Sequence, residues 1–136
     1  MKTRTIISTT ITLFLLIIGM GCEKETLNIN KSLIGEWQLI EQNTSSGTPT
    51  QPESVNDGYI LKFDLSGIIK TDLYSCDGKY SVSNNDNILT IQFNCQSKVK
   101  MTLLPISRLD FQGKDTLLLN SLNSDEPYIY IYKRLK

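Results

Sequence analysis

From residue 33 to the C-terminus, apolar and polar residues alternate in short runs that Gly, Asn, Asp, Ser and Pro residues separate. No window in this part keeps the spacing of an amphipathic helix. Alternation with a period of two is typical of strands that bury one face. Several such strands at regular spacing indicate a β-sandwich or a β-barrel. The pattern therefore predicts an all-β domain.

The alternating runs predict eight strands, at residues 35–42, 59–64, 68–74, 79–83, 88–95, 98–104, 115–120 and 127–134. Residues 106–113, which include Leu109 and Phe111, are interpreted as a connection or an irregular strand. Short turns join nearly all of these strands in sequence order. This order favours a small antiparallel up-and-down eight-stranded β-barrel, which leaves no free edge.

Two hairpins have a register that the sequence specifies, because a shift by one residue would move every apolar side chain to the other face. The turn at residues 65–67 places Gly67 where a positive φ is needed. The turn at residues 84–87 joins the second pair of strands. The expected partners are Phe63 with Ile69, Tyr59 with Leu73, Val82 with Leu89, Tyr80 with Ile91, and Gly78 with Phe93.

The first 21 residues have the pattern of an export signal. Lys2 and Arg4 precede an uncharged, largely apolar run at residues 6–18, which is too short to span a bilayer comfortably but fits a signal peptide. The small residues before Cys22 resemble the bacterial lipobox, at which the cysteine is lipidated and the peptide is cleaved. An ordinary signal peptide with an incidental cysteine and a retained membrane helix are the alternatives.

The lipobox resemblance implies a mature chain of 115 residues that begins at Cys22 and is anchored by its lipid. Attachment by more than one acyl chain is stable. The charged residues 23–25 resemble the export signals of Bacteroidetes surface lipoproteins. We therefore expect a lipoprotein signal peptide at 1–21, a lipidated cysteine and tether at 22–32, and a barrel at 33–136. The location would be the bacterial cell envelope, at the outer membrane, with the periplasmic and surface faces both open.

Cys76 and Cys95 remain once Cys22 is assigned to lipid, and the register of the second hairpin, continued outward, places them opposite each other. An exported protein meets oxidising conditions, in which paired cysteines form a disulfide. We expect such a bond to contribute about 3 kcal/mol. A metal pair and a redox site are the alternatives, but two cysteines without histidine fall short of a four-ligand zinc site.

Charge and composition exclude several classes of function. The chain has 14 basic and 14 acidic residues, and removal of residues 1–21 leaves 12 and 14. Nucleic-acid binding needs a concentrated positive surface, so we expect no nucleic-acid partner. The absence of histidine removes the usual general base and metal ligand. No phosphate loop, nucleophile elbow or metal motif is present. We therefore expect no enzyme, cofactor or metal; carboxylate chemistry at Asp64, Asp72 and Asp77 is the alternative.

Gly35-Glu36-Trp37, at the start of the first strand, resembles the Gly-x-Trp motif of lipocalins. The resemblance covers residues 33–136 and includes a long first loop at 43–57, Phe63-Asp64-Leu65-Ser66-Gly67, and a closing aromatic strand with an arginine. The chain is most similar to small lipocalin-like lipoproteins of Bacteroidetes. In lipocalins the tryptophan closes one end of the barrel and an arginine packs over it. The resemblance therefore implies that Arg134 packs on Trp37, with cation–π attraction as the physical basis.

Two non-catalytic functions remain open. The lipocalin resemblance implies a small apolar ligand inside the barrel, with a candidate cavity lined by Tyr59, Leu61, Phe63, Tyr80, Ile91, Phe93 and Met101. Inward side chains often fill a small barrel completely, so a packed core is the alternative. Tyrosine is favoured at interfaces, and Tyr128, Tyr130 and Tyr132 instead favour a module that docks on another envelope protein. These tyrosines could equally form the wall and core of the barrel.

Overall fold

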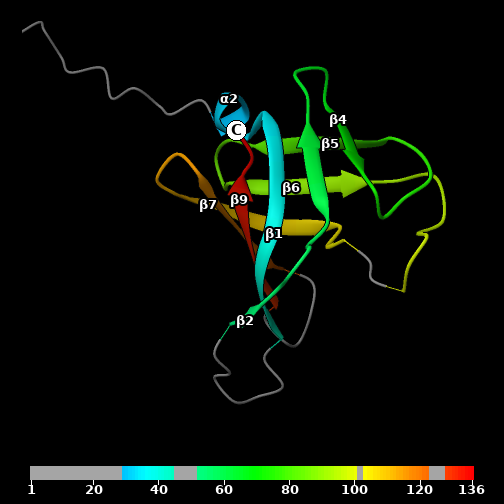
Figure 1. Cartoon of the computed structure of the whole chain (residues 1–136). Helices are drawn as coiled ribbons and strands as arrows, with labels where there is room; N and C mark the ends of the chain where they lie inside the picture. Colours follow the sequence, from blue (N-terminus) through cyan, green and yellow to red (C-terminus); the bar gives the residue numbers. More distant parts are fainter. Residues whose placement is uncertain (1–28, 45–51, 101–102, 123–127) are drawn as a thin grey trace, which may run out of the picture.

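The computed structural model describes residues 29–44, 52–100, 103–122 and 128–136. A short helix, α2 (Ile29–Leu33), precedes the strands, and the polypeptide then forms an antiparallel barrel (Figure 1). The strands are β1 (Gly35–Thr44), β2 (Glu53–Ser54), β3 (Ile60–Phe63), β4 (Ile68–Thr71), β5 (Gly78–Ser83), β6 (Ile88–Gln92), β7 (Ile106–Gln112), β8 (Thr116–Ser121) and β9 (Tyr128–Arg134).

The barrel closes through β1, which pairs with β3 on one edge and with β9 on the other. The first half of β1 pairs with β3, while Glu41 and Gln42 pair with the short strand β2. A register shift between Leu39 and Glu41 marks a bulge in β1 opposite β9. Because consecutive strands pair from β3 to β9, the predicted up-and-down barrel of eight strands is confirmed, with β2 as an addition to its edge.

The predicted registers agree with the structure along most of both hairpins. Phe63 lies opposite Ile69, and Tyr80 and Val82 lie opposite Ile91 and Leu89. The β3–β4 ladder ends at Leu61 and Thr71, short of the expected pair of Tyr59 and Leu73. Likewise, the β5–β6 ladder ends at Lys79 and Gln92, one position before Gly78 and Phe93.

The strand predicted at residues 98–104 was wrong, and the strand lies instead at Ile106–Gln112. Within the described residues, 98–100 and 103–104 belong to no strand. Ser97 forms an isolated bridge to Tyr74, and its hydroxyl lies within hydrogen-bond distance of the carbonyls of Leu73 and Val99. The edge of β6 is occupied by β7, so the alternating residues after Ser97 have no strand to pair with. Val99, one of the apolar positions of that alternation, is 47% exposed.

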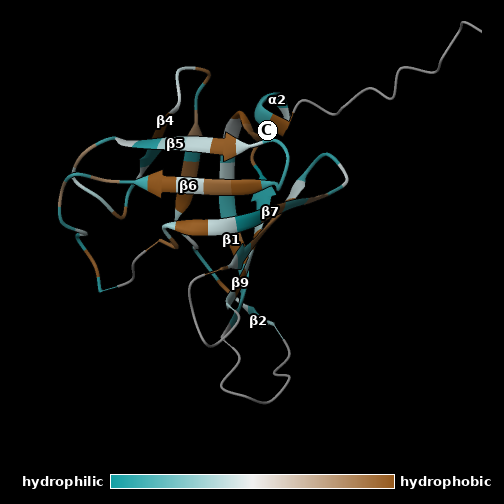
Figure 2. Cartoon of the chain, turned by 180° about the vertical axis from the view of Figure 1, so that it is seen from behind, coloured by the Kyte–Doolittle hydropathy of each residue, from teal (hydrophilic) through white to brown (hydrophobic). Residues whose placement is uncertain are grey.

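The core consists of the inward-facing side chains of the strands, and Figure 2 shows the corresponding alternation of apolar and polar colours along them. Two tyrosines of β9 face inward: Tyr132 is buried, and Tyr130 packs against the core. The buried apolar residues are Leu33, Trp37, Leu39, Tyr59, Leu61, Phe63, Ile69, Leu73, Leu89, Ile91, Leu103, Leu109, Leu117, Leu119 and Tyr132.

The antiparallel order gives the barrel two different ends. The turns at residues 64–67, 84–87 and 113–115 lie at the end where β1 begins, and we call this the closed end. The connections at residues 72–77 and at 93–100 with 103–105 lie at the opposite end, which we call the loop end. The C-terminus lies beside α2 in Figure 1, so both the helix and the end of the chain belong to the closed end.

Residues 29–32, which the sequence assigned to a tether, form most of α2 and pack against the barrel. Leu33 is fully buried, and Ile29 packs against the core. The chain is therefore attached to the closed end from residue 29 onward. Among the described helical residues, none forms a helix long and apolar enough to cross a membrane.

Candidate functional site

Trp37 and Arg134 close one end of the barrel. They are register partners in β1 and β9, and the guanidinium carbon lies 4.1 Å from the centroid of the indole ring. The indole Nε1 of Trp37 donates a hydrogen bond of 2.8 Å to the carbonyl of Leu33. The contact that the Gly-x-Trp resemblance implied is therefore present, and it also holds α2 in place.

Arg134 donates hydrogen bonds to three backbone carbonyls. It donates to Ile34 at 2.7 Å, to Lys114 at 3.1 Å, and to Ser32. These three carbonyls belong to the segment after α2, the β7–β8 turn and α2 itself. One side chain thus joins three segments at the closed end, which is a structural task.

Gly35 leaves room for this guanidinium. Its φ is +129°, and a Cβ built on it would lie 2.7 Å from Nη1 of Arg134. Any larger residue would therefore be strained in its backbone and would push the guanidinium aside. The glycine of the Gly-x-Trp motif is explained by this approach of an arginine from the other end of the chain.

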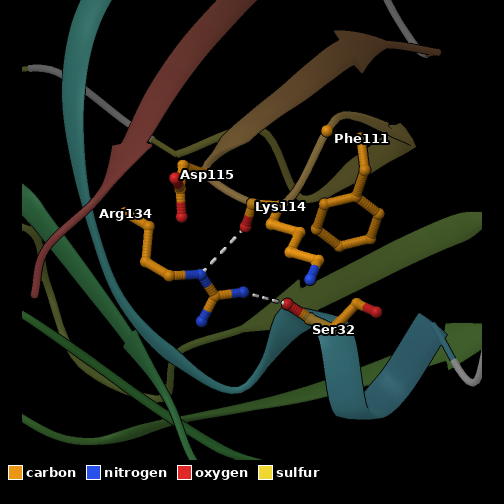
Figure 3. A pocket seen from close by; sticks show the side chains of 6 residues that line it. Ser32, Phe111, Lys114, Asp115 and Arg134 are labelled. Atoms are coloured by element: carbon orange, nitrogen blue, oxygen red, sulfur yellow. Dashed lines mark hydrogen bonds between the residues drawn. The ribbon is translucent and has the colours of Figure 1, made fainter.

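A hollow of about 820 Å³ lies beside this closure, between α2 and the β7–β8 turn (Figure 3). Ser32, Phe111, Gly113, Lys114, Asp115 and Arg134 line it. The ring of Phe111 packs on Trp37, with 5.9 Å between the ring centroids. Figure 3 shows Arg134 turned toward the carbonyls of Lys114 and Ser32. The N–H groups of its guanidinium are therefore already hydrogen-bonded to the protein's own backbone.

The loop end is held by the disulfide between Cys76 and Cys95. The sulfur atoms lie 2.11 Å apart and the Cα atoms 6.1 Å apart, which is disulfide geometry. The bond joins the connection before β5 to the connection after β6. The cysteine pairing expected from the hairpin register is therefore confirmed.

Two aromatic rings stack next to this disulfide. Tyr74 and Phe93 are nearly parallel, with 4° between their planes and 3.9 Å between their centroids. A Cβ on Gly78 would lie 2.7 Å from the ring of Phe93, so glycine at this position lets the ring lie flat on β5. The backbone of Lys98 donates to the carbonyl of Leu73, which joins the second connection to the first.

A second hollow, of about 380 Å³, opens at the loop end. Ile91 and Leu103 contribute buried side chains to its wall, whereas Gln92 and Pro105 are exposed. None of the described residues that line it carries a charge. They are Tyr74, Ile91, Gln92, Phe93, Cys95, Ser97, Leu103 and Pro105.

The residues predicted to line a cavity inside the barrel differ in how deeply the structure buries them. Tyr59, Leu61, Phe63 and Ile91 are buried core residues, and Tyr80 and Phe93 are partly buried against that core. Met101 lies outside the described residues. Of these residues, Ile91 and Phe93 line the hollow at the loop end.

A hydrogen bond between two hydroxyls crosses the interior at the level of Tyr59. The hydroxyl oxygens of Tyr59 and Tyr132 lie 2.7 Å apart, and both side chains are buried. Burial raises the pKa of each hydroxyl well above its usual value, with the partner's hydrogen bond as a smaller influence. Both tyrosines are therefore neutral structural groups near neutral pH.

Two of the aspartates considered for carboxylate chemistry, Asp64 and Asp77, lie at opposite ends of the barrel. Asp64 lies at the closed end, where it accepts hydrogen bonds from Ser66 and Ile68 and shapes the β3–β4 turn. The Ser66 hydroxyl is the main cause that lowers the pKa of Asp64. Asp77 lies near the loop end and pairs with Lys70 at 3.1 Å. Among the described residues, no group of three potential metal ligands exists.

Comparison with known proteins adds no relative: no protein-family model and no curated protein matches the chain. The candidate site therefore rests on geometry. The sequence missed five of its described residues, Tyr74, Gln92, Ser97, Leu103 and Pro105, because they lie in connections or at the ends of strands. The expected disulfide was the one signal that could have directed attention to them.

Proposed function

We propose that this protein is a non-catalytic binding protein of the bacterial cell envelope, anchored to the membrane by lipid on Cys22. Residues 1–21 act as its lipoprotein signal peptide, and the barrel presents its loop end as the binding face. One observation carries the proposal: the disulfide pins two connections around an uncharged hollow at the end of the barrel opposite to the chain's point of attachment.

The arrangement of the two ends supports this function. The chain enters the barrel through α2 at the closed end. Six residues separate Cys22 from Ile29, and this segment can span at most roughly 25 Å. An anchor at Cys22 therefore keeps the closed end near the bilayer and directs the loop end away from it. A face directed away from the membrane is accessible to ligands and partners.

Replacement of the lipid-bearing residue tests the proposal. The wild-type chain, produced in a Gram-negative host, should fractionate with membranes and yield an acylated N-terminal peptide that begins at Cys22. Cys22→Ser should remain unprocessed or lose its acyl groups, because the lipid is attached through the thiol. Cys76→Ser with Cys95→Ser is the matched control and should be acylated normally. An unacylated wild-type N-terminus that begins at another residue would overturn the anchor.

Docking on another envelope protein is a second candidate, and exposed apolar residues at the loop end favour it. Val99, in the connection after β6, is 47% exposed, and Leu122, which directly follows β8, is 39% exposed. The three tyrosines that suggested an interface in the sequence support it less, because Tyr132 is buried and Tyr130 packs on the core. Crosslinking in intact cells should recover one reproducible partner, and Val99→Asp should reduce its yield.

A further inference from the structure

The hollow at the loop end has the walls of a site for a small neutral molecule. Its volume of about 380 Å³ lies at the small end of the range for ligand sites. Side chains of Ile91 and Leu103, which are buried, form its apolar part together with the ring of Phe93. Tyr59 and Tyr132, whose hydroxyls are hydrogen-bonded in the core, are not among the described residues that line this hollow.

The chemistry of the lining selects the class of ligand. No lysine, arginine, aspartate or glutamate is among the described residues that line the hollow, so a charged ligand would lose hydration there without gaining a counter-ion from them. The stacked pair of Tyr74 and Phe93 provides aromatic surface against which another ring can pack. The exposed Gln92 makes no side-chain hydrogen bond to any described residue, and its amide can both donate and accept one.

The walls of the hollow are held in position before a ligand arrives. Cys95 is one of the lining residues, and its disulfide to Cys76 fixes the start of the connection after β6. The hydroxyl of Ser97 lies 3.2 Å from the carbonyl oxygen of Leu73 and 2.7 Å from that of Val99, so it can donate to either. Ile91 donates its backbone N–H to the carbonyl of Pro105 at 2.9 Å. A preformed site loses less entropy on binding than a flexible one.

We propose that this hollow binds a small, uncharged ring compound, which packs against Tyr74 and Phe93 and exchanges a hydrogen bond with the amide of Gln92. The proposal rests on the proposed function, since it names the ligand class for the same binding face. It also predicts a dependence on the disulfide, because a reduced Cys95 would free one wall of the hollow.

Photolabelling of the full chain in the membrane fraction tests the site. Benzophenone is the probe, because it is a neutral two-ring compound that forms covalent adducts with nearby C–H bonds under light. Benzoylbenzoate, which adds a carboxylate to the same rings, is the matched charged control. We expect benzophenone adducts on residues 91–97 and 103–105, competition by excess naphthalene, and much weaker labelling by benzoylbenzoate.

Variants with matched controls locate the site within the loop end. Gln92→Trp should crowd the hollow and lower the labelling yield at least about tenfold, whereas Thr90→Trp, on the same exposed face of β6, should not. Tyr74→Ala removes the stacked ring and should lower the yield similarly, whereas Tyr74→Phe keeps the ring and should preserve it. An unchanged thermal unfolding midpoint of Gln92→Trp ensures that lost labelling reports the site.

Three results would overturn the proposal: adducts concentrated at residues 111–115 around the hollow at the closed end, labelling that naphthalene does not compete, or equal labelling by benzoylbenzoate. The experiment distinguishes a failure of the proposed lipid anchor from a failure of the proposed ligand site. A chain recovered in the soluble fraction would contradict lipidation at Cys22, while the map of adducts would still show whether the hollow binds the probe.

Discussion

At the scale of single residues, Arg134 connects the most distant parts of the chain. Two of its hydrogen bonds reach carbonyls far away in the sequence, with Ile34 separated from it by 100 residues and Ser32 by 102. The cation also lies on the ring of Trp37. Hydrogen bonds from charged donors each contribute roughly 1.5–3 kcal/mol, and cation–π contacts add about 0.5–2 kcal/mol.

Arg134→Met should therefore lower the free energy of unfolding by roughly 2–4 kcal/mol, which is less than the sum of these contributions because water can reach the exposed and partly buried carbonyls. The methionine keeps part of the packing on Trp37 but leaves three carbonyls without their donor. Lys133→Met, at the exposed neighbouring position in β9, is the control and should change stability by less than about 0.5 kcal/mol. Urea denaturation of both variants gives the comparison, and equal midpoints would contradict a structural role for Arg134.

The buried tyrosine pair predicts a loss of stability at alkaline pH. Burial raises the pKa values of Tyr59 and Tyr132 in the folded state, so the native state keeps protons that the unfolded chain releases. The free energy of unfolding should then be fully present below about pH 10 and fall as the pH rises further, by up to about 1.4 kcal/mol per pH unit for each tyrosine.

The double variant Tyr59→Phe with Tyr132→Phe tests this dependence. It removes both hydroxyls together, so neither is left buried without a partner, and stability near neutral pH should change little. Its free energy of unfolding should decline less steeply above about pH 10 than that of the wild type. Tyr128→Phe, on the same strand but outside the pair, is the control. A double variant with the wild-type slope would contradict the prediction.

At the scale of elements, alternation predicted most strands correctly because each strand of the barrel buries one face. The failure at residues 98–104 has a physical cause. Val99 and Leu103 alternate with polar residues as in a strand, but the disulfide at Cys95 and the Tyr74–Ser97 bridge draw this segment to the loop end. The edge that it would need is paired with β7. Local alternation does not reveal which edges are free.

The disulfide should stabilise the two connections that form the loop end. Replacement of both Cys76 and Cys95 by serine should lower the free energy of unfolding by about 3 kcal/mol, since the bond closes a loop with a sequence separation of 19. Reduction of the wild type by dithiothreitol should produce the same shift in the denaturant midpoint, and the reagent should leave the double variant unchanged. A reduced wild type as stable as the oxidised one would contradict this contribution.

At the scale of the whole molecule, the two ends of the barrel have different tasks. The closed end carries α2, the Trp37–Arg134 contact and the attachment of the chain. The loop end carries the disulfide and the uncharged hollow. Antiparallel order separates these features, because alternate connections lie at opposite ends of the barrel.

With Cys22 as the proposed anchor, this separation predicts the orientation of the protein on a membrane. Lys31 on α2 and Lys98 at the loop end are both exposed. On vesicles, the acylated protein should react more slowly with an amine reagent at Lys31 than it does in detergent, while Lys98 should react at the same rate in both. Mass spectrometry of the labelled peptides measures both positions. Protection of Lys98 instead would reverse the orientation.

The sequence by itself determined the all-β class, the barrel, the main hairpin registers and the pairing of Cys76 with Cys95. These follow from local alternation, turn residues and register, which are properties of neighbouring segments. The lipocalin resemblance of Gly35-Glu36-Trp37 also pointed to the partner of Trp37, although not to the three carbonyls that Arg134 binds.

Only the tertiary structure decided which apolar residues fill the barrel and where a hollow remains. Packing depends on the sum of side-chain volumes from strands far apart in the chain, and no single segment carries that information. Tyr59, Leu61 and Phe63 are buried in the core, whereas Tyr74, Leu103 and Pro105, which alternation had not distinguished, line the hollow at the loop end together with Phe93. The candidate site exists because the disulfide and the barrel closure bring these connections together.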